Sequence, residues 1–115
     1  MGSKNISQRK GFWSEYVVIQ LLTAKKWELI GWRSTLDKIE VDLIFKKKNT
    51  LLMAEVKFLS SDWNIFERIK PQQIGRLKKA YMKLRFEKAD YEILSYVFYV
   101  NKHAKVKFIS LSDID

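Results

Sequence analysis

The sequence predicts an α/β sandwich in which a mixed sheet is flanked by helices. Two stretches, residues 7–26 and 71–88, carry apolar side chains at helical spacing. Runs rich in β-branched and aliphatic residues lie between and after them, separated by short polar segments as in strands. The predicted order is α-β-β-β-α-β-β. We expect residues 1–115 to form one domain, because this length is enough to bury a single core.

Composition narrows the chemistry that the chain can support. The net charge of +9 attracts polyanions, chiefly nucleic acid, with anionic membrane as the lesser alternative. There is no cysteine, and the one histidine, His103, cannot build a zinc site alone. Any metal would therefore be held by oxygen ligands, which favours Mg²⁺ or Mn²⁺. No apolar run approaches the ~20 residues of a membrane span, so we expect a cytoplasmic protein without membrane contacts.

The first helix is predicted over residues 7–26, with Ser7 as its cap. Glu15 falls on its apolar face, where a carboxylate is uncommon unless it has a partner. It would extend to solvent or pair with a lysine, or it would reach the acidic residues described below as a third carboxylate. The apolar face comprises Phe12, Tyr16, Ile19 and Leu22.

Residues 27–33 are predicted as a short first strand, followed by a turn over residues 34–38. Its tryptophans would lie in the core or at the rim of a groove.

Residues 39–58 form the centre of the prediction, because two apolar runs flank a short polar segment as in a β-hairpin. A two-residue turn at Lys48–Asn49 pairs Lys47 with Thr50. The same register sets Asp42 opposite Glu55.

Side-chain alternation brings three charges to one face of this hairpin: Asp42, Glu55 and Lys57. Two adjacent carboxylates repel each other unless positive charge lies between them, and a divalent cation would supply it. Lys57 would hold a nucleophilic water or a phosphate oxygen. The alternative is a solvated sheet face with a Glu–Lys pair. The opposite face would carry Val41, Leu43, Phe45, Ala54, Val56 and Phe58.

The second half of the chain begins with a loop over residues 59–69 that holds Ser60, Ser61, Trp63 and Phe66. Its aromatic side chains would pack in the core or, if exposed, stack on bases or sugars. Pro71 suits the first turn of the second helix. Strands are predicted at 91–100 and, as an edge strand, at 106–111. The buried stripe of the helix comprises Ile74, Leu77, Tyr81 and Leu84. Its other faces carry seven bases against one acid, Glu87: Lys70, Arg76, Lys78, Lys79, Lys83, Arg85 and Lys88.

Taken together, residues 9–100 resemble the PD-(D/E)XK nuclease superfamily, closest to the YraN-like (UPF0102) family and the archaeal-type Holliday junction resolvases. The matching motifs are Lys10-Gly11 with Glu15, Gly31-Trp32, Glu40-Val41-Asp42-Leu43-Ile44, Glu55-Val56-Lys57 and Pro71-Gln72-Gln73. The chain departs from the family pattern at Ile39 (usually Gly), Val41 (Pro in the superfamily name), Phe58-Leu59 (a small polar and basic pair) and Gln72 (often Lys).

The resemblance implies a restriction-endonuclease-like α-β-β-β-α-β core and a metal-dependent DNA endonuclease. Asp42, Glu55 and the Val56 carbonyl would bind Mg²⁺ or Mn²⁺, with Glu15 completing the shell. Lys57 would orient the attacking water, and Gln73, favoured over Gln72, would assist. The substrate would be DNA, including branched DNA such as a four-way junction, with a role in repair or recombination and a homodimer on such a substrate. The expected DNA contacts are Lys10, Arg76, Lys79 and Lys83.

Two other classes of function fit the same residues. A non-catalytic nucleic-acid-binding module would keep the fold and lack turnover. A binding protein of another kind would use its positive charge on acidic proteins or membranes.

Overall fold

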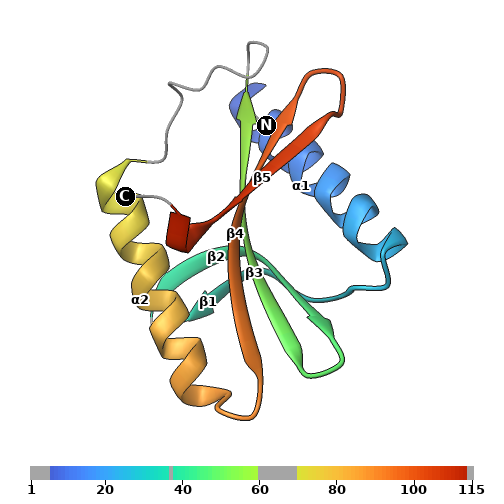
Figure 1. The fold of residues 1–115 in the computed structure, drawn as a ribbon. Coiled ribbons are helices and arrows are strands. Elements are labelled where there is room, and N and C mark those ends of the chain that lie inside the picture. Colours follow the sequence, from blue (N-terminus) through green and yellow to red (C-terminus); the bar gives the residue numbers. More distant parts are fainter. Residues whose placement is uncertain (1–5, 37, 60–69, 114–115) are drawn as a thin grey trace, which may run out of the picture.

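The computed structural model describes residues 6–36, 38–59 and 70–113 (Figure 1). Within these ranges the elements follow the predicted order. They are α1 (Ile6–Ala24), β1 (Glu28–Leu36), β2 (Ile39–Lys47), β3 (Thr50–Leu59), α2 (Pro71–Glu87), β4 (Glu92–Asn101), β5 (Val106–Ser110) and a short 3₁₀ turn, η1 (Leu111–Asp113).

The five strands form one mixed sheet in the order β1-β2-β3-β4-β5. Neighbouring strands are antiparallel except β3 and β4, which are parallel. The exception follows from the connection, because α2 carries the chain back so that β4 starts beside the start of β3. The fold is therefore an α/β architecture with the nuclease-like α-β-β-β-α-β core and one further strand.

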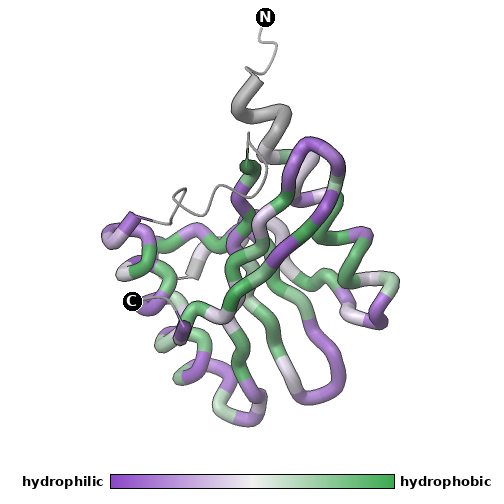
Figure 2. Tube along the Cα trace, turned by 45° about the horizontal axis from the view of Figure 1, so that its top comes forward, coloured by the Kyte–Doolittle hydropathy of each residue, from purple (hydrophilic) through white to green (hydrophobic). Residues whose placement is uncertain are grey.

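The helices cover opposite faces of the sheet, which makes three layers (Figure 1). Val18 and Leu22 of α1 pack in a cluster with alternate residues of β2, β3 and β4. Ala80 and Leu84 of α2 pack on the other face. Figure 2 shows apolar residues along the central strands and polar ones at the β4–β5 turn. Among the described residues, no helix is long and apolar enough to cross a membrane.

The first helix differs from the prediction in its limits and in its buried face. It is already helical at Ile6, so Ser7 is a residue of the helix and not its cap. It ends at Ala24, where Lys26 takes the left-handed conformation (φ 74°) and Trp27 N–H donates to the Leu22 carbonyl. Tyr16, predicted to be buried, is exposed. The helix turns the row Ser14, Glu15, Val18 and Leu22 to the sheet, which fits helical spacing equally well.

The first strand is longer than predicted, because the segment expected to be a turn is mostly strand. Ser34 pairs with Val41 and Leu36 pairs with Ile39, so β1 and β2 form a tight hairpin. Lys38 adopts φ 66° beside that turn. This extension places Arg33 inside the sheet and not at the end of a strand.

The hairpin register is confirmed from Lys47–Thr50 to Leu43–Ala54, with the turn at Lys48–Asn49. Lys48 takes φ 54° there. The predicted face of Val41 is wrong. Leu43 belongs to the cluster under α1, whereas Val41 belongs to the cluster under α2. Simple alternation fails because the β2–β3 ladder, followed from the turn, ends at the Leu43–Ala54 pair and does not reach Asp42 or Val41.

The second half agrees with the prediction where the structure describes it. Leu77, Ala80 and Leu84 are the buried residues of α2, and the predicted Ile74 and Tyr81 are partly buried beside them. The residues Ser60, Ser61, Trp63 and Phe66 lie outside the described residues.

Candidate active site

Asp42 lies next to the Leu43–Ala54 pair, where the β2–β3 pairing ends. Its side chain accepts the hydrogen bond of a β3 backbone N–H beyond that pair. The Val56 N–H donates to Asp42 Oδ2 at 2.9 Å. A buried backbone donor needs a partner, so this contact fixes the carboxylate of β2 against β3. Asp42 is thereby held next to Glu55, the residue before Val56.

Glu55 is the centre of the acidic cluster. Only 8% of it is exposed. The amide Nε2 of Gln73, in the first turn of α2, donates to Glu55 Oε2 at 2.6 Å, while Gln72 is exposed. The favoured glutamine is thus the one that contacts the acids. Glu55 also shares a hydrogen bond with Asp42, and Lys57 lies close enough to act on its charge.

The environment raises the pKa of Glu55 from 4.5 to about 8. Burial is the largest cause, and the charge of Asp42 and the hydrogen bond shared with it follow. Lys57 and Gln73 act in the opposite direction and lower the pKa of Glu55, but they do not offset the three causes that raise it. At neutral pH and without a cation, Glu55 therefore keeps its proton.

This donor set fits a hard divalent cation. A divalent cation bound here would favour the ionised form of Glu55 and displace its proton. Mg²⁺ typically takes one or two carboxylates and fills its other positions with water and substrate phosphate. Asp42 and Glu55 would hold such an ion, with the Val56 carbonyl as a third oxygen. Among the described residues, no group of three or more acidic or histidine side chains is arranged around one point.

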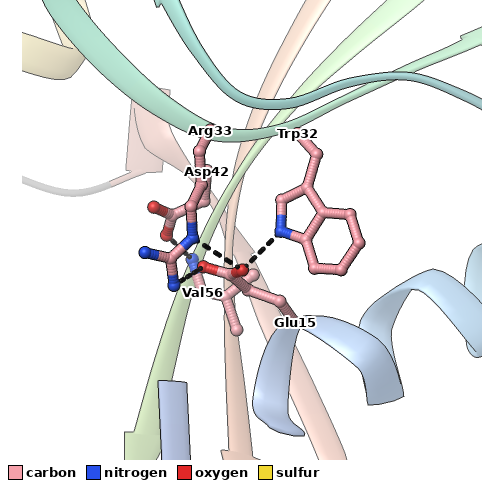
Figure 3. A network of polar contacts seen from close by, with 5 residues as sticks. All are labelled: Glu15, Trp32, Arg33, Asp42 and Val56. Atoms are coloured by element: carbon pink, nitrogen blue, oxygen red, sulfur yellow. Dashed lines mark hydrogen bonds and ion pairs between the residues drawn. The ribbon is translucent and has the colours of Figure 1, made fainter. Parts of the chain in front are cut away.

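Glu15 is buried, with 4% of it exposed, and is already engaged by two side chains of β1. Arg33 contacts both carboxylate oxygens, through Nε and Nη2, each at 3.2 Å. The indole N–H of Trp32 donates to Oε1 at 2.6 Å (Figure 3). Glu15 is thus paired with an arginine and not with the lysine considered from the sequence. Its place in a metal shell stays a prediction.

The sequence reasoning did not single out Arg33. Arg33 adopts φ 52°, and its guanidinium lies 4.2 Å from the centre of the Phe12 ring. A signal was nonetheless present. A glutamate on the apolar face of a helix requires a base, and Trp32-Arg33 stands in the strand that precedes the acidic hairpin.

The predicted DNA-contact residues lie mostly on α2, the helix that also carries Gln73. Arg76 and Lys79 are exposed, and Lys83 pairs with Glu87 at 3.5 Å. Lys10 belongs to α1, and its side chain lies outside the described part of the chain. An open groove of about 670 Å³ borders this helix, lined by Ile39, Lys78, Lys79, Met82 and Lys83.

Comparison with known proteins identifies relatives of this chain. No family model matches it. A UPF0102 protein of Prochlorococcus marinus is 37% identical over 78 residues, 64% of this chain and 61% of the relative. One of Christiangramia forsetii is 37% identical over 82 residues, 70% of this chain and 66% of the relative. One of Maricaulis maris is 28% identical over 74 residues, 64% of this chain and 58% of the relative.

The matched segment spans about three fifths to two thirds of the length of these curated relatives. Their names give a family and no activity. The fold and the sequence motifs agree with this assignment. The chain therefore belongs to the UPF0102 family.

Proposed function

We propose that this protein is a metal-dependent DNA endonuclease that hydrolyses phosphodiester bonds. The observation that supports it most is the Asp42–Glu55 pair, in which Glu55 is buried, Asp42 is half-buried and the pKa of Glu55 is raised to about 8. Placing two carboxylates side by side away from solvent costs free energy unless a positive group or a metal ion compensates their charge. Strongly perturbed acids of this kind concentrate at functional sites.

In the proposed mechanism each residue of the cluster has one task. Asp42, Glu55 and the Val56 carbonyl hold Mg²⁺ or Mn²⁺. When bound, the ion supplies charge stabilisation at the phosphoryl oxygens and a water of lowered pKa. Lys57 orients the attacking water or neutralises the charge that develops on phosphorus. Gln73 keeps Glu55 oriented through its 2.6 Å hydrogen bond.

DNA is the proposed substrate, with branched DNA such as a four-way junction as the first form to test. The net charge of +9, with Arg76, Lys79 and Lys83 on α2, supports a polyanionic partner. The nuclease resemblance selects DNA among polyanions. On a two-fold substrate such as a junction, we propose that the protein acts as a homodimer.

The experiment is incubation with duplex, single-stranded, flap and four-way-junction DNA in Mg²⁺, Mn²⁺ or EDTA. We expect cleavage of at least one substrate with either metal and none in EDTA. The matched control is Asp42→Asn, which conserves shape and removes one ligand charge. Cleavage by Asp42→Asn at the wild-type rate would contradict the proposal.

A second candidate is a non-catalytic nucleic-acid-binding module of the same fold. It is favoured by the absence, within the described residues, of a third carboxylate beside Asp42 and Glu55. In both cases, reversing Lys79 and Lys83 to Glu should weaken DNA binding and reduce its salt dependence by about one unit of slope per lost phosphate contact. DNA binding without cleavage of any substrate would select the second candidate.

A further inference from the structure

We propose that Arg33 is a binding residue for a backbone phosphate of the nucleic acid, held in place by Glu15 and Phe12. This inference rests on the proposed nucleic-acid substrate and adds a phosphate subsite beside the acidic cluster. In it, Glu15 is a positioning residue that acts through Arg33.

The first argument is the position of Arg33 in the sheet. Trp32 pairs with Leu43 and Ser34 pairs with Val41, so Arg33 lies at the level of Asp42 on the neighbouring strand. A phosphate at the Asp42–Glu55 pair would therefore have an arginine beside it. Figure 3 shows the Arg33 guanidinium and the Asp42 carboxylate in the same part of the site.

The second argument is that the guanidinium is fixed before any ligand arrives. Glu15 receives its Nε and Nη2 at 3.2 Å, and Phe12 supports its plane at 4.2 Å. The backbone of Arg33 is in the left-handed region, which a non-glycine residue adopts only at a cost. A prearranged arginine loses less side-chain entropy when it binds an anion.

The third argument is that one edge of the Arg33 guanidinium does not contact Glu15. Arginine has five N–H donors, and Glu15 engages donors on the Nε and Nη2 atoms. In Figure 3 the other terminal nitrogen points away from Glu15, on the side of Asp42. The side chain is 39% exposed, although its partner Glu15 is buried. This outer edge has the geometry that receives a phosphate oxygen.

The alternative is a purely structural role, in which Arg33 serves only as the counterion of Glu15. A lysine would keep that charge, but it lacks the planar fork that can bind a carboxylate on one edge and a phosphate on the other. Arg33→Lys therefore separates the two roles. The matched control is Arg85→Lys on α2, where the arginine stacks 5.8 Å from the Tyr81 ring.

The test measures binding of a fluorescent 20-base-pair duplex by anisotropy in EDTA, where cleavage does not interfere. We expect about tenfold weaker binding for Arg33→Lys and a change within about twofold for Arg85→Lys. In the wild type, NMR should show the Arg33 Nε–H signal shifting on addition of the same duplex, which needs no substitution. Equal affinities of the two lysine variants, or an unmoved Arg33 signal, would overturn the inference.

Glu15→Gln tests the positioning role. It should weaken duplex binding several-fold, and adding it to Arg33→Lys should cause little further loss, because both act through one guanidinium. Its half-saturating Mg²⁺ concentration in cleavage should equal that of the wild type. A clear rise in that concentration would instead place Glu15 in the metal shell and overturn the positioning role.

These outcomes are separable from those of the proposed function. Cleavage by the wild type with equal duplex binding by both lysine variants would remove only the Arg33 subsite. Weaker binding by Arg33→Lys in a protein that cleaves no substrate would keep the subsite and remove the nuclease.

Discussion

Glu15 and Glu55 are two buried glutamates of one small domain, and the structure surrounds them in opposite ways. Glu15 receives an arginine on both oxygens and an indole N–H. Glu55 receives an amide from Gln73 and another carboxyl group, Asp42. The first is a satisfied ion pair. The second is a buried acid beside another acid, and the pKa of Glu55 therefore rises to about 8.

The difference teaches that burial alone does not mark a metal site. A buried acid whose charge is balanced by protein groups has little to gain from a cation. A buried acid beside another acid gains from any cation that enters. We therefore propose that the metal binds at the Asp42–Glu55 pair and that the arginine held by Glu15 binds phosphate.

The largest expected effect is on the rate of cleavage, at the cluster that contains Glu55. Lys57→Ala should lower the rate by about 10²–10³ at saturating Mg²⁺, because it removes one charge stabiliser. Its half-saturating Mg²⁺ concentration should stay unchanged, since a protonated lysine is no metal ligand. Single-turnover cleavage across a Mg²⁺ titration measures both quantities. A wild-type rate in this variant would undo the proposed mechanism.

The next effect is on stability, where the two glutamates should respond with opposite signs. Glu55→Gln mimics the protonated acid, donating to Asp42 and accepting from Gln73, so at pH 8 to 9 it should stabilise the metal-free protein by roughly a few kcal/mol. Glu15→Gln should destabilise it by about 1–2 kcal/mol, a modest value because Arg33 is partly exposed. Urea unfolding of both variants provides the comparison. Changes of the same sign would remove the distinction between the two sites.

The smallest expected effect is the dependence of stability and of Mg²⁺ affinity on pH, which follows from the raised pKa of Glu55. The folded protein keeps a proton that the unfolded chain has released, so the free energy of unfolding should fall as pH rises from about 4.5 to about 8. Mg²⁺ must displace that proton, and its apparent affinity should rise about tenfold per pH unit below pH 8. Calorimetric Mg²⁺ titrations at pH 6, 7 and 8 measure this slope. The slope should vanish in Glu55→Gln.

The sequence predicted the acidic cluster well because its geometry is mostly local. Asp42 and Glu55 lie on two strands joined by a two-residue turn, and that turn sets the register as far as the neighbouring Leu43–Ala54 pair. Pro71 marks the start of α2, but the expectation that Gln73 lies at the site came from the family resemblance. Short-range rules were therefore sufficient for the two acids and not for the glutamine.

The environment of Glu15 could not be predicted in the same way. Its partners depend on β1 continuing past Arg33, on the left-handed backbone of that residue, and on how α1 crosses the sheet. The helical period did not decide between Tyr16, which is exposed, and Val18, which is buried. Val41 was assigned to the wrong face because alternation was extended past the end of a ladder.

The central claim is that Glu55 ionises beside Asp42 only at a free-energy cost, which a bound divalent cation would relieve. Carboxyl ¹³C NMR of Glu55, assigned with Glu55→Gln, tests it directly through a pH titration with and without Mg²⁺. We expect a midpoint near 8 without metal, and a clearly lower midpoint in saturating Mg²⁺. A midpoint near 4.5 without metal, or one that Mg²⁺ leaves unmoved, would contradict the assignment of this pair as a metal site.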